Sequence, residues 1–181
     1  MKGWYKIIKV DENFKNKIEN LFNIKEFSDI VFLCIGSSRI IGDAIGPIVG
    51  SNLKYLENNF IHIYGSIEKN LNFNNAKEII ENINFKYKNP CIITIDSALS
   101  NKYDFGNIIL EKGFMKIGKA LERNLCIYSN LNIKCVVGKK FFDKKRNLET
   151  LQQVPKTEII KMSNIISNEI KNIVENISLY V

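Results

Sequence analysis

The most informative part of this 181-residue chain reads Ile30-Val-Phe-Leu-Cys-Ile-Gly-Ser-Ser-Arg-Ile-Ile-Gly-Asp43. Its first six residues are all apolar, which is typical of a central parallel strand that is buried on both faces. Gly36 and Gly42 bound a short loop. The apolar residues that follow recur at helical spacing and predict a helix over residues 43–58.

The same alternation continues along the chain. Residues 60–65 predict a second strand, residues 75–83 a second helix, and residues 91–95 a third strand that is again almost entirely apolar. Strands that alternate with helices in this way are typical of a doubly wound α/β sheet. We therefore expect one α/β domain over residues 1–181, built as a three-layer α/β/α sandwich with a mostly parallel central sheet.

The remaining parts of the chain are less regular. Residues 106–111, 125–129 and 134–138 predict three shorter strands, spaced for hairpins or sheet edges. After Pro155, a long amphipathic helix is predicted, with Thr157 as its N-cap. Packing of this helix on its own sheet is the ordinary explanation, and a partner-binding helix is the alternative.

The N-terminal segment is harder to place. Residues 4–10 fit a short edge strand and residues 13–22 fit a helix. We treat residues 1–25 as a candidate peripheral extension of the domain.

Composition excludes several classes of protein. At 45% hydrophobic and 25% charged residues, the chain can build a core, which excludes bulk disorder. Its apolar runs are strand-sized, far below the ~20 residues that a membrane helix needs. The first ten residues carry charges and lack the cleavage pattern of a signal peptide. We expect a cytoplasmic protein with no membrane partner.

The net charge of +7 does not by itself indicate a nucleic-acid partner. The 26 basic residues are 23 Lys and only 3 Arg, and Arg is the residue favoured for bidentate phosphate and base contacts. High Lys, Asn and Ile content together is typical of an AT-rich genome. One basic cluster remains, for which a solvated loop is the ordinary explanation and a patch for an anionic partner is the alternative: Lys139, Lys140, Lys144, Lys145 and Arg146.

The cysteines and the single histidine favour structural roles. Cys34, Cys91, Cys126 and Cys135 form no C-x-x-C pair and lie in apolar runs, so we expect buried, reduced thiols. His62 lies in an alternating strand pattern. A satisfied structural histidine is therefore favoured over a His-based catalytic device.

Two acidic residues follow the first and third predicted core strands. Asp43 opens the first predicted helix, and Asp96 directly follows residues 91–95. Ligands collect at the carboxyl ends of neighbouring parallel strands, so we expect both side chains in one crevice. Two close carboxylates cannot both ionise cheaply, which lets one act as an acid and the other as a base toward water. We expect Asp43 to be ionised and Asp96 to hold the proton. Helix capping by Asp43 and turn formation by Asp96 are the structural alternatives.

Polar residues beside this pair complete the candidate site. Gly36, Ser37 and Ser38 are candidates to supply backbone or hydroxyl donors to a substrate carbonyl. Ser97 is a candidate either to orient Asp96 or to form a turn. The loop matches neither a Walker nor a Rossmann fingerprint, and Asp43 at its end would repel phosphate, so we expect no nucleotide.

A family resemblance covers most of the chain from about Ile30. Residues 32–50 resemble the signature of the YyaC-type sporulation proteins, which are relatives of the spore germination protease. The stretches His62-Ile-Tyr-Gly65 and Ile92-Ile-Thr-Ile-Asp-Ser-Ala-Leu99 are similar to that family's next two landmarks, in the same order.

The resemblance implies a fold like that of the hydrogenase-maturation peptidases. It also implies an acidic pair that matches Asp43 and Asp96, as in an aspartic-type endopeptidase. In the hydrogenase-maturation branch the matching pair joins a histidine to bind metal. No histidine follows His62 in this chain, so we expect neither a metal nor another cofactor.

Three hypotheses stay open. The first is a peptidase that acts on a protein or peptide substrate, small spore proteins among them, in the cytoplasm of a sporulating cell or spore. The second is an inactive relative that binds a peptide or protein in the same cleft. It is favoured by departures from the family pattern around the expected pocket, where residues 111–121 keep two glycines but lose the prolines. The third is a binder of acidic polymer through the cluster at residues 139–146.

Overall fold

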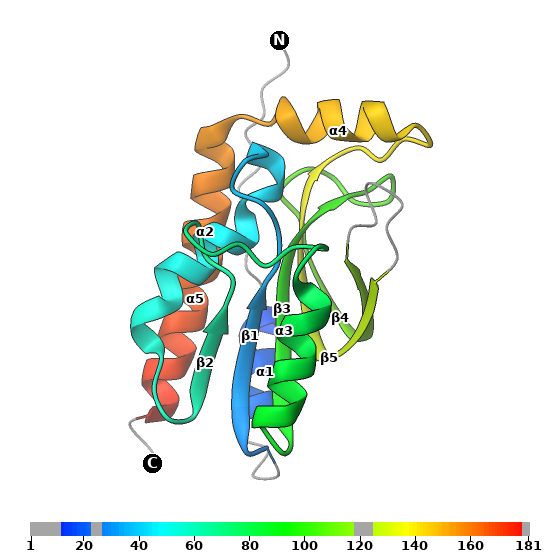
Figure 1. The fold of residues 1–181 in the computed structure, drawn as a ribbon. Coiled ribbons are helices and arrows are strands. Elements are labelled where there is room, and N and C mark those ends of the chain that lie inside the picture. Colours follow the sequence, from blue (N-terminus) through cyan, green and yellow to red (C-terminus); the bar gives the residue numbers. More distant parts are fainter. Residues whose placement is uncertain (1–11, 23–26, 118–124, 179–181) are drawn as a thin grey trace.

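Within the described residues, five strands form one mixed sheet in the order β2-β1-β3-β5-β4 (Figure 1). The structure is a computed structural model that describes residues 12–22, 27–117 and 125–178. The strands are β1 (Asp29–Cys34), β2 (Ile61–Tyr64), β3 (Pro90–Leu99), β4 (Ile108–Ile117) and β5 (Leu125–Gly138). Only β4 runs antiparallel to its neighbour, which confirms the predicted mostly parallel sheet.

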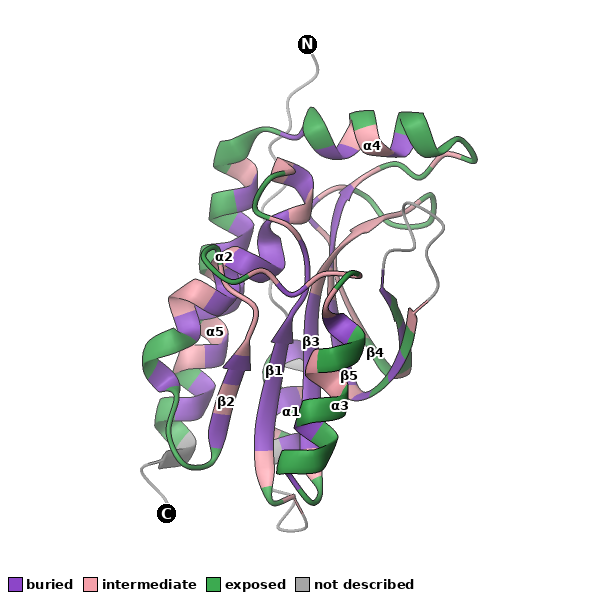
Figure 2. Cartoon of the chain, in the orientation of Figure 1, coloured by how far each residue is buried: buried purple, intermediate pink, exposed green. Residues whose placement is uncertain are grey.

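Three helices cover one face of the sheet. They are α1 (Glu12–Phe22), α2 (Ile45–Leu53) and α5 (Lys156–Ser178), and their buried faces share a core with the strands (Figure 2). Phe32 in β1 and Ile93 in β3 are fully buried in this core. Apolar residues spaced three and four apart place one stripe of α5 on the sheet, so the helix packs on its own domain.

The opposite face is covered by one helix and by the outer half of the antiparallel β4–β5 pair (residues 113–117 and 125–129), which folds over the sheet and is called the ribbon below. Helix α3 (Ala76–Lys86) packs there beside the outer half of the β4–β5 hairpin. Met115 and Ile117 of β4 and Ile127 of β5 share a second core with Val31 and Leu33 of β1. The predicted three-layer sandwich is therefore present, and a β-ribbon forms part of its third layer.

The ribbon bends at Gly113, where the β4–β5 register breaks. Gly113 has φ +92°, a conformation that residues with a Cβ rarely adopt. Asn132 is fully buried beside the bend, and its Nδ2 donates to Gly113 O at 3.0 Å. Thr94 Oγ1 donates to Asn132 Oδ1 at 2.7 Å, and Ser129 Oγ lies 2.7 Å from the same oxygen. These buried polar groups form hydrogen bonds with one another at the point where the β4–β5 pairing is interrupted.

The single strand β5 corrects one prediction. Residues 125–129 and 134–138 belong to one strand instead of two, because the polar residues between them bind neighbouring strands and do not form a turn. Asn130 Oδ1 accepts from Ile92 N at 2.8 Å. Likewise β4 extends to Ile117, beyond the predicted residues 106–111.

The N-terminal helix is a core element. Phe14, Ile18 and Leu21 of α1 are buried in the first core, so the idea of a peripheral extension is wrong for residues 12–22. The helix predicted over residues 13–22 is confirmed. The edge strand predicted over residues 4–10 lies outside the described residues.

Several helix boundaries differ from the prediction. Helix α2 begins at Ile45, and Asp43 instead ends the short 3₁₀ helix η1 (Ile41–Asp43). A second 3₁₀ turn, η2 (Lys54–Leu56), follows α2. Helix α5 begins at Lys156, so Thr157 lies in its first turn and is not the N-cap. The predicted second helix is confirmed as α3.

Helix α4 (Lys144–Gln152) was not predicted. Asp143 caps it by accepting from the backbone N–H groups of Lys145 and Arg146. Three members of the basic cluster therefore lie on a helix and not in a loop.

The thiols and the histidine lie largely as expected. Cys34, Cys91 and Cys135 are buried, whereas Cys126 is exposed on the outer half of β5 and corrects the expectation for that residue. His62 Nε2 lies 2.8 Å from Asp29 Oδ1, and its ring stacks on Tyr87. It is a satisfied structural residue. No helix within the described residues is both long and apolar enough to span a membrane.

Candidate functional site

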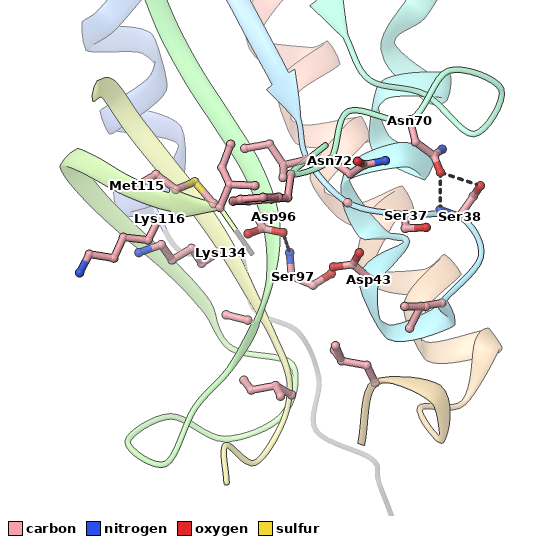
Figure 3. Close-up of a pocket in the computed structure, with 18 of the residues that line it drawn as sticks. Ser37, Ser38, Asp43, Asn70, Asn72, Asp96, Ser97, Met115, Lys116 and Lys134 are labelled. Carbon is pink, nitrogen blue, oxygen red and sulfur yellow. Dashed lines mark hydrogen bonds between the residues drawn. The ribbon is translucent and has the colours of Figure 1, made fainter. Parts of the chain in front are cut away.

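A cleft of about 890 Å³ opens at the carboxyl ends of β1 and β3 (Figure 3). The chain leaves β1 toward α2 on one face of the sheet, whereas β3 runs on beyond the end of β1 beside β5. The carboxyl ends of neighbouring parallel strands are where open α/β sheets bind ligands. Asp43 and Asp96 both line the cleft.

The first wall is the loop between β1 and α2, and Gly36 sets its path. Gly36 has φ +143°, and a Cβ there would lie 2.0 Å from the backbone oxygen of Asp43. The loop closes on itself because Ser37 N donates to that same oxygen at 3.1 Å. A tight, glycine-dependent turn therefore brings Asp43 back to the end of β1.

Asp43 does not serve as a helix cap. The N-cap position of α2 is Ala44, and no side chain of the described residues caps that helix. The structural alternative for Asp43 is therefore wrong, and its carboxyl group faces the cleft (Figure 3).

Asp96 lies within β3 and not after it. Strand β3 continues through Leu99 because it still pairs with β5, although β1 has ended at Cys34. Asp96 Oδ1 accepts a hydrogen bond from Ser97 N at 2.8 Å. This contact with the adjacent residue orients the carboxyl group, and a turn role for Asp96 is wrong.

The two carboxyl groups influence each other. Burial raises the pKa of Asp43 to about 7, although the backbone N–H of Ser37 partly offsets the increase. Burial raises the pKa of Asp96 well above its usual range, and repulsion from Asp43 raises it further. The Ser97 N–H and the Lys134 ammonium act in the opposite direction. The pair therefore favours a state in which Asp96 holds a proton.

Lys134 is a site residue that the sequence analysis missed. It is the direct neighbour of Asp96 across the β3–β5 pairing, and its Nζ forms an ion pair with Glu111 of β4. A charged residue in the largely apolar stretch of residues 131–137, which otherwise contains only Asn132 as a polar residue, was the available signal. Only the strand register shows that this charge faces Asp96.

The predicted donors occupy the cleft, but most are already engaged. The N–H groups of Gly36, Ser37 and Ser38 donate to Leu71 O, Asp43 O and Asn70 Oδ1, respectively. The expectation that they serve as free backbone donors is therefore wrong. The Ser38 hydroxyl also contacts Asn70, at 3.1 Å.

Two hydroxyl groups remain as candidate donors. Ser37 Oγ accepts from Arg39 N at 3.3 Å, which leaves its proton for another acceptor. Ser97 Oγ is buried, and within the described residues it has no hydrogen-bond partner. In Figure 3, Ser97 lies between the two aspartates. A buried hydroxyl without a partner is costly, which suggests a ligand group as its partner.

A metal centre of the hydrogenase-maturation kind does not fit these residues. That centre needs a histidine beside the acidic pair. The only histidine of the chain, His62, is hydrogen-bonded to Asp29 near the opposite end of the strands. Among the residues that the structure describes, no three His, Cys, Asp or Glu side chains gather as ligands.

The basic cluster reaches the cleft at one point. Lys140 lines the rim, where its backbone N–H donates to Asn101 Oδ1 at 3.2 Å. Arg39 is also exposed at the rim. The remaining members of the cluster are on or beside α4.

Solved structures with a similar fold include hydrogenase maturation proteases. Among solved structures, the NiFe hydrogenase maturation protease HycI from Thermococcus kodakarensis KOD1 matches 87% of this chain and 98% of its own, with a TM-score of 0.58 and 19% identity. HybD from the same organism matches 77% of this chain at 13% identity, with a TM-score of 0.39. The first of these similarities establishes the shared fold.

Sequence comparison finds a nearer relative. The uncharacterized protein YyaC of Bacillus subtilis (strain 168) is 29% identical over 138 residues, which are 76% of this chain and 66% of the relative. This chain therefore spans slightly less than two thirds of that relative's length. A family model for proteins of unknown function, DUF1256, matches residues 5–169. Because that match covers most of the chain, the protein belongs to the DUF1256 family.

Proposed function

We propose that the cleft hydrolyses peptide bonds with Asp43 as the general base and Asp96 as the general acid. The observation that carries this proposal is the pair of interacting carboxyl groups, both with raised pKa values, in one cleft. A fold shared with hydrogenase maturation proteases is consistent with it. Perturbed carboxyl groups of this kind cluster at catalytic sites.

The proposed reaction uses one water molecule. Ionised Asp43 removes a proton from water as the water oxygen attacks the peptide carbonyl carbon. Asp96 gives its proton to the leaving amide nitrogen as the C–N bond breaks, which produces a carboxylic acid and an amine. The proton on Asp43 then returns to Asp96 by way of solvent. The hydroxyl groups of Ser37 and Ser97 donate to the developing oxyanion.

The chemistry of the rim fits a polypeptide substrate. Amide side chains and cations surround the acidic pair, and Asn72, Lys116 and Lys140 are among them. We propose protein substrates in the cytoplasm of a sporulating cell, small spore proteins among them, on the basis of the resemblance to YyaC-type proteins.

One observation favours a second function. The N–H groups of residues 36–38 are engaged inside the protein, so these three residues offer no backbone oxyanion hole. Binding of a peptide or protein without cleavage is therefore the alternative.

Peptide mass spectrometry separates the two functions. We would incubate the protein with small acid-soluble spore proteins and with carboxymethylated casein, beside Asp43→Asn and Asp96→Asn variants. Glu81→Gln on the exposed side of α3 is the matched control. Fragments made by the wild type and the control, but by neither aspartate variant, are expected. Equal fragmentation by all four proteins contradicts the acid-pair mechanism, and an absence of fragments favours binding.

A further inference from the structure

Strand β3 has an open edge inside the cleft. Strand β1 pairs with β3 only as far as Cys34 and Ile95, and the final contact is Ile35 N donating to Ile95 O at 2.8 Å. The chain then turns away at Gly36. Strand β3 continues to Leu99 with β5 on its other side, so within the described residues no strand pairs with the edge that β1 has left.

The register shows which backbone groups face this edge. Ser100 N donates to Gly138 O of β5 at 2.9 Å, so Ser100 points toward β5. Successive residues of a strand direct their N–H and C=O groups to opposite sides, so those of Ser97 and Leu99 point toward the open edge. Ser97 N is occupied by the Asp96 carboxyl group. Considering only the residues that the structure describes, the Ser97 carbonyl and both backbone groups of Leu99 remain for a partner.

These groups lie beside the catalytic pair. Residues Asp96, Ser97, Ala98, Leu99 and Ser100 all line the cleft. The Ser97 hydroxyl is buried there and has no hydrogen-bond partner in the part of the chain that the structure describes. An edge of three residues spans about 10 Å, enough to align a short piece of extended chain.

We infer that the substrate binds as an added β-strand on this open edge, next to the position that β1 leaves. One residue of a parallel peptide donates its N–H to Ser97 O and accepts from Leu99 N. Its neighbouring peptide bonds then lie beside Asp43 and Asp96. The inference rests on the proposed function for its choice of occupant, and it narrows the substrate to extended, unfolded polypeptide. In a helix, or in a strand inside a folded sheet, the backbone N–H and C=O groups that would bond to this edge already have hydrogen-bond partners.

Amide exchange provides the first test. The probe is a library of random decapeptides with blocked termini, added to the full-length Asp43→Asn protein so that peptides remain intact. Peptides retained by the protein are sequenced and one is resynthesised. At saturation with it, we expect exchange of the Leu99 amide to slow at least tenfold. The Ser100 amide, which is already bonded to Gly138, is the internal control. Unchanged exchange at Leu99 with a bound peptide overturns the inference, and so does a library from which nothing binds.

Paired substitutions at one position provide the second test. Leu99→Pro removes the N–H but keeps an apolar side chain, whereas Leu99→Ala keeps the N–H and removes most of the side chain. We expect proline to weaken peptide binding at least tenfold more than alanine does. Equal weakening by the two variants contradicts strand addition. Circular dichroism checks that both variants fold.

A third test changes no protein residue and remains valid if Leu99→Pro fails to fold. Each amide of the bound peptide is N-methylated in turn, which removes one donor at a time. Strand addition predicts that N-methylation weakens peptide binding at every second residue. Weaker binding that does not alternate along the peptide overturns the inference. Periodic binding without cleavage by the wild type rejects the peptidase and retains the edge. Cleavage without periodicity rejects the edge and retains the peptidase.

Discussion

The two walls of the cleft are built in different ways. The first wall, residues 36–43, is one continuous loop that turns at a single glycine and ends at Asp43. The second wall combines Asp96 of β3, Lys134 of β5 and Glu111 of β4, which come from distant parts of the chain. A local turn therefore positions one carboxyl group, whereas long-range strand pairing determines the surroundings of the other. The two walls should respond differently to substitution.

The largest effect is expected from Gly36→Ala in the first wall. The new Cβ would lie 2.0 Å from a backbone oxygen at a φ of +143°, so both clash and strain oppose folding. We expect a loss of about 4 kcal/mol in the free energy of unfolding. Gly113→Ala, at the bend that supports the second wall, is the matched control, because its φ is +92° but no atom of the described residues lies within 4 Å of the new Cβ. It should cost only about 1–2 kcal/mol. Similar losses in urea unfolding would contradict the role given to the clash.

The next largest loss of stability is expected at the bend that supports the second wall. Asn132→Ala removes the side chain that joins Thr94, Ser129 and Gly113, and leaves buried polar groups without partners. We expect a loss of about 2–3 kcal/mol in the free energy of unfolding. Asn82→Ala on the exposed side of α3 should change it by less than about 0.5 kcal/mol. A loss at Asn132 no greater than that at Asn82 would show that the network does not hold the bend.

A third prediction concerns pH. The pKa of Asp43 is raised to about 7 in the folded protein, above its unfolded value of about 4. Between these values the folded state binds more protons than the unfolded state, so the free energy of unfolding falls as pH rises through this window. Asp43→Asn should therefore stabilise the protein at pH 8 by up to about 4 kcal/mol and have little effect at pH 4. Urea unfolding at the two pH values measures this, and an equal gain at both would refute the linkage.

The smallest effect comes from the charge in the second wall. The Lys134 ammonium lowers the pKa of Asp96, so Lys134→Met should raise that pKa further. Lys116→Met, at the exposed rim of the same cleft, removes the same charge type away from the β3–β5 pairing. Carbon-13 NMR of the Asp96 carboxyl group follows the titration directly. An equal change of the Asp96 pKa in both variants would mean that the total positive charge of the cleft, and not the pairing of Lys134 with Asp96, sets this pKa.

The catalytic proposal also predicts a direction for the pH–rate profile. Hydrolysis needs Asp43 ionised and Asp96 protonated. Cleavage should therefore increase as pH rises through about 7 and fall again when Asp96 loses its proton. Rates of peptide cleavage between pH 5 and 10 test this, and highest activity at pH 5 would contradict the assigned roles.

The amino-acid sequence by itself determined the parallel core of the sheet and the convergence of Asp43 and Asp96. Continuous apolar runs, glycine-bounded turns and helical periodicity act over a few neighbouring residues, so they can be interpreted without knowledge of the rest of the chain. Only the tertiary structure decided the extent of β3 beyond β1, the folded-over ribbon and the position of Lys134 beside Asp96. Strand register and burial depend on residues far apart in the chain. They also decide which backbone groups lack partners and which charges are desolvated, and both of these features shape the cleft.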